Sequence, residues 1–240
     1  MMDEVMKQWF PFTDYDFYAY LTAGMVFIAA CDYSLAGQVL IDRSEWTLVQ
    51  IVFWTAVAYL AGQLLAAPSS ALLEHFVVRT VLRPPIAIQL GLIERRWRER
   101  VVAFLFANRE YAPLPKEIRG RIIERAAKAL DVEIDSLSDP EAIFGVAYLV
   151  ARRSEDAVSR MDQFRNLYGF SRNISFVGLL AAGIIGYRYW QSPAADVGYF
   201  LFGSLLLAIG MFGRFVKFYA AFGAEVLRAF GTSESVKEVP

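Results

Sequence analysis

The sequence predicts an all-α integral membrane protein, with four transmembrane helices in two hairpins and a helical cytoplasmic domain inserted between them. Three observations lead to this fold class. The chain of 240 residues is 56% hydrophobic, its apolar residues gather into long runs, and most of its cations lie between the second and third runs. Apolar flanks around a charged centre are typical of a multi-pass membrane protein and not of one soluble domain.

Four apolar runs are the predicted spans: Phe17–Gly37, Leu48–Ala67, Ile174–Trp190 and Val197–Phe212. At about 1.5 Å per helical residue, such runs approach or match a hydrocarbon core of about 30 Å. The helical pattern of the last run continues without a turn signal to Phe230, which predicts one helix that extends beyond the membrane.

The distribution of cations predicts the orientation. Of the 24 Lys and Arg residues, 17 lie within 68–173, and the two short connections with their flanks contain only Arg43 and Arg188. Segments rich in Lys and Arg stay on the cytoplasmic side, so the central segment and both termini are expected on the cytoplasmic side of the cell inner membrane. The expected parts are an N-terminal hairpin (1–67), a cytoplasmic domain (68–173), a C-terminal hairpin with its extension (174–230) and a flexible tail (231–240).

The central segment has helical periodicity throughout. A helix that continues from the second span should end at the "RPP" of 83–85, and further helices are expected over Ile86–Asn108 and Lys116–Leu130. The "SDPE" of 138–141 predicts a helix start with Ser138 as N-cap.

Asp32 follows the single cysteine, Cys31, near the outer end of the first run. "IAAC" at 28–31 resembles a bacterial lipobox, but residues 1–16 hold four acids and one lysine, unlike the basic start of a signal peptide. Two interpretations of Asp32 remain open. It is either an interfacial acid that reaches water or the partner of Arg188 in an ion pair that joins the two hairpins.

Small residues recur every four positions in two of the spans, and they let helix backbones approach closely in lipid. The contacts they predict lie within one chain or between protomers, and the second case would give a closed homo-oligomer. The residues are Ala58, Gly62 and Ala66 in the second span and Gly178, Ala182 and Gly186 in the third.

Two polar clusters are candidates for function. Four arginines around Trp97 could contact anionic lipid or a phosphate-bearing ligand, although the interleaved acids favour a solvated helix face; they are Arg95, Arg96, Arg98 and Arg100. Arg172 and Asn173 lie where the third span begins, the position of a gate or relay or of a simple interfacial anchor.

No catalytic, cofactor or metal site is predicted. The chain has a single histidine, His75, so neither a zinc site nor a His-paired nucleophile follows from its residue types, although Ser69 and Ser70 lie nearby. The formal net charge of −1 gives no basic excess for nucleic-acid binding.

Two functions therefore remain. The first is a homo-oligomeric channel or membrane-perturbing effector in a bacterial inner membrane, controlled through its cytoplasmic domain by a protein or small-molecule ligand. The alternative is a non-conducting membrane anchor or sensor for a soluble partner protein. The architecture loosely resembles small four-span bacterial effectors encoded in defence systems, without a residue motif that assigns a family.

Overall fold

The structure is a computed structural model that describes residues 17–106, 109–134 and 137–232. These residues form helices and no strands, which confirms the all-α prediction. Three helical segments are long and apolar enough to span a membrane: Leu48–Gln89, Glu155–Gln191 and Ala195–Thr232. The chain therefore has the composition of a membrane protein with three candidate spans.

The chain divides into two compact units. The first comprises residues up to Phe76 and 169–215, and the second comprises 77–168 and the residues after 215. The sequence placed the corresponding limits at 67 and 173. All three divisions between the units fall inside helical segments that continue across them.

The first helical segment of the first unit, as far as the structure describes it, is slightly shorter than a full span. A turn of π-helix, η1 (Phe17–Leu21), leads into α3 (Thr22–Ser34). Together η1 and α3 comprise the 18 residues 17–34, which rise at most about 27 Å at the standard helical pitch, slightly below the ~30 Å of a hydrocarbon core. A first span over Phe17–Gly37, and with it a total of four, is accordingly not established by the helix lengths.

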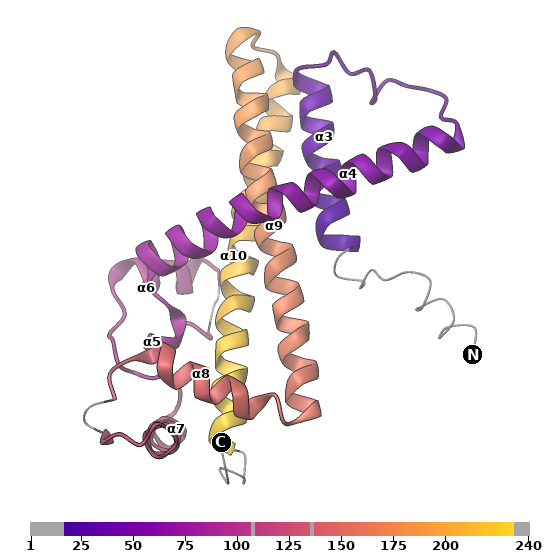
Figure 1. The fold of residues 1–240 in the computed structure, drawn as a ribbon. Helices are drawn as coiled ribbons and strands as arrows, with labels where there is room; N and C mark the ends of the chain where they lie inside the picture. The colour runs from indigo at the N-terminus through magenta and orange to yellow at the C-terminus, as the bar shows by residue number, and fades with distance from the viewer. Residues whose placement is uncertain (1–16, 107–108, 135–136, 233–240) are drawn as a thin grey trace, which may run out of the picture. The chain divides into compact units, whose positions relative to one another are not determined.

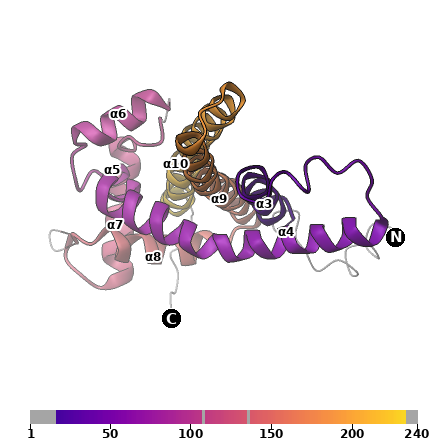
Figure 2. The same cartoon turned by 90° about the horizontal axis from the view of Figure 1, so that it is seen from above.

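Helix α4 (Leu48–Ser69) begins with a capping box. Thr47 Oγ1 accepts from the Gln50 amide at 3.4 Å and Gln50 Oε1 accepts from the Thr47 amide at 3.1 Å. The helix crosses α3 at a steep angle and does not lie antiparallel beside it (Figure 1; Figure 2). It contains Pro68 and continues as the π-type helix η2 (Ser70–Leu82). The segment ends as predicted before Pro84 and Pro85, with Arg83 in a left-handed conformation at φ 61°.

The two longest helices are α9 (Glu155–Gln191) and α10 (Ala195–Thr232). In the most apolar stretch of α9, 61% of the residues are buried inside the protein, against 11% for the α4 segment and for α10. Helix α9 is thus the most enclosed of the three, whereas the other two present apolar surface that lipid would cover. Exposed aromatic residues gather around the connection of α9 and α10, as at a membrane boundary: Tyr187, Tyr189, Trp190 and Tyr199.

The second unit has four further helices, α5 (Pro85–Gln89), α6 (Trp97–Leu105), α7 (Lys116–Leu130) and α8 (Pro140–Ala151). The apolar faces of α5, α7 and α8 pack on the C-terminal part of α10 around Ile122, Ile143 and Phe230, all fully buried. The helix predicted over Ile86–Asn108 is interrupted. Gly91 turns the chain at φ 71° between α5 and α6, a conformation that glycine adopts without steric cost.

Two helix limits also differ from the sequence analysis. Asp139, not Ser138, is the N-cap of α8, because its carboxylate accepts from the Glu141 amide at 2.8 Å and Pro140 takes the first helical position. The extension of α10 is confirmed and continues through Gly231 and Thr232. The rest of the predicted tail, 233–240, lies outside the described residues.

Candidate functional site

Asp32 is buried at the end of α3, with 3% of its surface exposed. Its two carboxylate oxygens accept from the Leu40 amide at 3.1 and 3.0 Å, and Oδ2 also accepts from the Ile41 amide at 3.0 Å. The acid therefore fixes the loop that follows α3. Backbone amides can satisfy the hydrogen-bonding capacity of a buried carboxylate without a cation.

The predicted ion pair of Asp32 with Arg188 is not among the ion pairs formed by the described residues. Arg188 instead contacts the next residue. Its Nη1 donates to the Tyr33 carbonyl oxygen, and its guanidinium carbon lies 4.4 Å from the centre of the Tyr33 ring. The Tyr33 hydroxyl donates to Asp196 Oδ2 at 3.0 Å. Tyr33 thus joins α3 to α9 and α10, the link that the sequence analysis assigned to Asp32.

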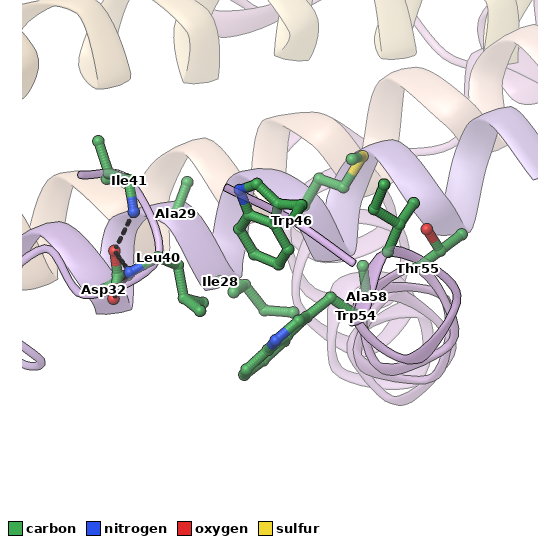
Figure 3. A pocket seen from close by; sticks show the side chains of 11 residues that line it. Ile28, Ala29, Asp32, Leu40, Ile41, Trp46, Trp54, Thr55 and Ala58 are labelled. Atoms are coloured by element: carbon green, nitrogen blue, oxygen red, sulfur yellow. Dashed lines mark hydrogen bonds between the residues drawn. The ribbon is translucent and has the colours of Figure 1, made fainter. Parts of the chain in front are cut away.

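An apolar cavity of about 510 Å³ lies between α3, the loop after it and α4 (Figure 3). Ile28, Trp46 and Trp54 form much of its wall, and the carboxylate of Asp32 is turned toward the backbone amides of the loop. Its size is in the range of small-ligand sites. The chemistry it offers is apolar contact, since the acid at its edge already has its hydrogen-bond partners.

A second polar group joins η2 to the middle of α9. Arg172 Nη1 donates to Glu74 Oε2 at 2.7 Å, and the two side chains are 14% and 15% exposed. The Arg172 guanidinium also reaches Asn173 Oδ1 at 3.3 and 3.4 Å, and the Ser70 hydroxyl donates to Glu74 at 3.3 Å. We name Glu74, Arg172 and Asn173 the junction cluster.

The junction cluster includes polar atoms without a protein partner. Asn173 is 1% exposed, and its Nδ2 has no hydrogen-bond partner among the described residues. The same holds for the buried hydroxyls of Ser69 and Ser171. An unpaired polar atom in an apolar surrounding costs about 1–3 kcal/mol, so such atoms call for an explanation. The sequence identified Arg172 and Asn173, but Glu74 lies 98 positions away and was not assigned to them.

The small-residue stripes face other helices of the same chain. A Cβ at Gly62 would collide with the Tyr20 carbonyl oxygen, and one at Gly24 with the Ala58 carbonyl oxygen. A Cβ at Gly178 would lie 2.9 Å from the Ala208 backbone nitrogen, and one at Gly186 would lie 3.6 Å from Leu201. Ala182 is buried and Ala66 is half-buried. The contacts observed for these residues are thus of the first predicted kind, packing within a single chain.

The arginine run takes an unexpected orientation. Glu99 is fully buried and pairs with Arg83, whose Nε lies 3.2 Å from Glu99 Oε1. Arg96, Arg98 and Arg100 are exposed, and Arg95 donates to the Tyr111 carbonyl oxygen at 3.4 Å. The Tyr111 hydroxyl donates to the Arg83 carbonyl oxygen at 2.7 Å. Burial, and next the charge of Glu99, raise the pKa of Tyr111 far above its usual range, so this hydroxyl stays a donor.

The ring of His75 contacts the backbone of Ser70. Its ring nitrogen Nδ1 lies 3.1 Å from the Ser70 carbonyl oxygen. Among the residues that the structure describes, no group of three or more His, Cys, Asp or Glu side chains could hold a metal ion. No family model, curated protein or solved structure matches the chain.

Proposed function

We propose that the protein is a homo-oligomeric channel or membrane-perturbing effector of a bacterial inner membrane, and that the Glu74–Arg172 ion pair holds its resting state. The observation that carries this proposal is the junction cluster, a charged pair with an unpaired amide inside helical segments apolar enough to span a membrane. Ionisable groups in such segments are costly and commonly mark ion pathways or gates.

The position of the pair suits control from the second unit. Glu74 and Arg172 lie two and three residues from the divisions at Phe76 and Gly169, on helical segments that continue from one unit into the other. A ligand or protein bound by the second unit could act through these helices if it favoured one of two arrangements. In the proposed topology the α3 segment is a short membrane helix in addition to the three candidate spans, and both termini lie in the cytoplasm.

The proposal requires several copies around a pore. Because the small-residue stripes already pack within the chain, the exposed apolar faces of α4 and α10 are the surfaces available for protomer contacts. Subunit number is measured by light scattering in mild detergent and by mass measurement in lipid discs. A monomer in both would contradict the oligomeric channel.

The test of function is ion flux from liposomes that contain the purified protein. Removal of one partner of a buried pair leaves the other charge uncompensated, at a cost of about 3–5 kcal/mol. Glu74→Gln and Arg172→Gln should therefore destabilise the resting state and raise the basal flux several-fold. The exchanged pair, Glu74→Arg with Arg172→Glu, should bring the flux back toward the wild-type value.

Arg160→Gln is the matched control. Arg160 is on the same helix and pairs with Glu225 at 2.6 Å, but its side chain is 59% exposed, so its loss should leave the flux unchanged. If all variants assemble correctly and none carries ions above protein-free liposomes, the channel is refuted and the alternative, an anchor or sensor for a soluble partner, takes its place.

A further inference from the structure

Helix α6 presents its apolar face outward. Trp97 is 70% exposed and Phe104 is 84% exposed, and Val101 and Leu105 on the same face are exposed as well. Positions i, i+4, i+7 and i+8 lie on one side of an α-helix, so these four side chains form a continuous apolar stripe. The opposite side carries Glu99, which is fully buried. This pattern is the reverse of that on an ordinary water-facing helix.

The contacts of Glu99 fix this orientation. Its Oε1 pairs with Arg83 at 3.2 Å, and its Oε2 accepts from the Arg96 amide at 2.6 Å at the start of the helix. Arg83 is held in turn, because its Nη2 donates to the Glu94 carbonyl oxygen at 2.6 Å and its own carbonyl accepts from Tyr111. A buried charge cannot turn outward without losing these partners, so the apolar stripe stays exposed.

Arginines flank the stripe. At 100° per residue, Arg98 lies on one edge of the stripe and Arg100 on the other, and Arg96 precedes the first turn. All three are exposed, and the Arg98 guanidinium carbon lies 5.7 Å from the centre of the Trp97 ring. An apolar face with Trp and Phe bordered by cations is typical of helices that lie in the headgroup region of a membrane. The same cations would repel the α6 of a second copy, which disfavours a symmetric protein contact.

We propose that α6 lies on the surface of the membrane that the protein spans, with Trp97 and Phe104 at the level of the acyl chains and Arg96, Arg98 and Arg100 against anionic lipid headgroups. Only the 14 residues 83–96, which include the short helix α5, separate the end of η2 at Leu82 from α6. This attachment raises the local concentration of lipid around the helix, so that even nine residues suffice. The inference rests on the membrane embedding in the proposed function but not on conduction.

The test measures the depth of position 104 in the full-length protein. A spin label is attached to Phe104→Cys in a Cys31→Ser background, and the protein is placed in lipid discs of phosphatidylcholine and phosphatidylglycerol. Collision rates are then measured with oxygen, which enters the bilayer, and with a nickel chelate, which stays in water. A label at Lys128→Cys, an exposed position on α7, is the matched control.

We expect the oxygen-to-nickel ratio at position 104 to exceed that at 128 severalfold. The variant with Arg96, Arg98 and Arg100 all changed to Gln should lose most of this excess, because each cation near an anionic surface strengthens binding about fivefold. Pure phosphatidylcholine discs should give the same loss. Equal nickel accessibility at 104 and 128 would overturn the proposal, and so would low collision rates with both reagents at 104, which indicate burial against protein. Flux through the liposomes does not enter this measurement, so the two proposals fail independently.

Discussion

Each of the two fully or almost fully buried acids of the described chain finds its own kind of partner. Asp32 accepts from backbone amides of one loop, and Glu99 combines one amide with the guanidinium of Arg83. In the Arg83–Glu99 pair the arginine side chain is 21% exposed and the acid is fully buried, whereas in the Arg160–Glu225 pair the arginine side chain is 59% exposed. The difference in burial therefore predicts that loss of the Arg83–Glu99 pair destabilises the protein far more than loss of the Arg160–Glu225 pair.

Arg83→Ala should lower the free energy of unfolding by about 3–5 kcal/mol, because it leaves Glu99 buried without a cation. Arg160→Ala should lower it by at most ~1 kcal/mol, since an exposed pair is screened by solvent. Thermal and denaturant unfolding of the detergent-solubilised protein, followed by circular dichroism, measures both. Addition of Glu99→Gln to Arg83→Ala should restore part of the loss, and equal losses in the two single variants would contradict this account.

At the scale of helices, close packing decides which glycines are essential. Gly24 and Gly62 lie where α3 and the helix before it meet α4, and a Cβ at either position would collide with a backbone carbonyl. Backbone atoms cannot move aside as a flexible side chain can. Gly203 also lies in a candidate spanning helix, but a Cβ there would meet no atom within 4 Å.

Gly62→Ala and Gly203→Ala should therefore act in opposite directions. The first should destabilise the protein by about 1–3 kcal/mol through overpacking. The second should be neutral or stabilise it by up to about 1 kcal/mol, since alanine favours the helix more than glycine does. Thermal stability in detergent measures both. If Gly203→Ala lowered thermal stability as much as Gly62→Ala does, overpacking at the contact of α4 with the N-terminal helices could not explain the loss at Gly62.

At the scale of the whole molecule, the concentration of cations within 68–173 is the strongest indication of how the chain is oriented relative to the membrane. Lys128 lies in this segment and is exposed, and Ser44 lies in the loop between α3 and α4 and is also exposed. The positive-inside rule predicts that Lys128 faces the cytoplasm and that Ser44 lies on the other side of the membrane.

Single cysteines at these positions, in the Cys31→Ser background, test the orientation in intact cells. Ser44→Cys should react with a membrane-impermeant thiol reagent, and Lys128→Cys should react only after the membrane is permeabilised. The reverse labelling would invert the proposed topology. Labelling of both in intact cells would contradict any membrane between them.

The sequence by itself determined the helical class, the second, third and fourth apolar runs as long helices, and the extension of the last helix. These properties depend on periodicity and composition over neighbouring residues, which local reading captures. It also located Arg172, Asn173 and the α6 arginines as notable groups. The roles of these residues could not be predicted from the sequence, because the role of a charged side chain depends on the groups that it contacts.

Only the tertiary structure decided those partners. Arg172 meets Glu74 from another helix, Arg188 meets Tyr33 instead of Asp32, and Glu99 turns inward to Arg83. Each contact joins residues at least 16 positions apart, so their spacing carries no signal in the sequence. The physical reason is that burial and long-range pairing set the energy of a charge, and both arise only when separate helices pack together.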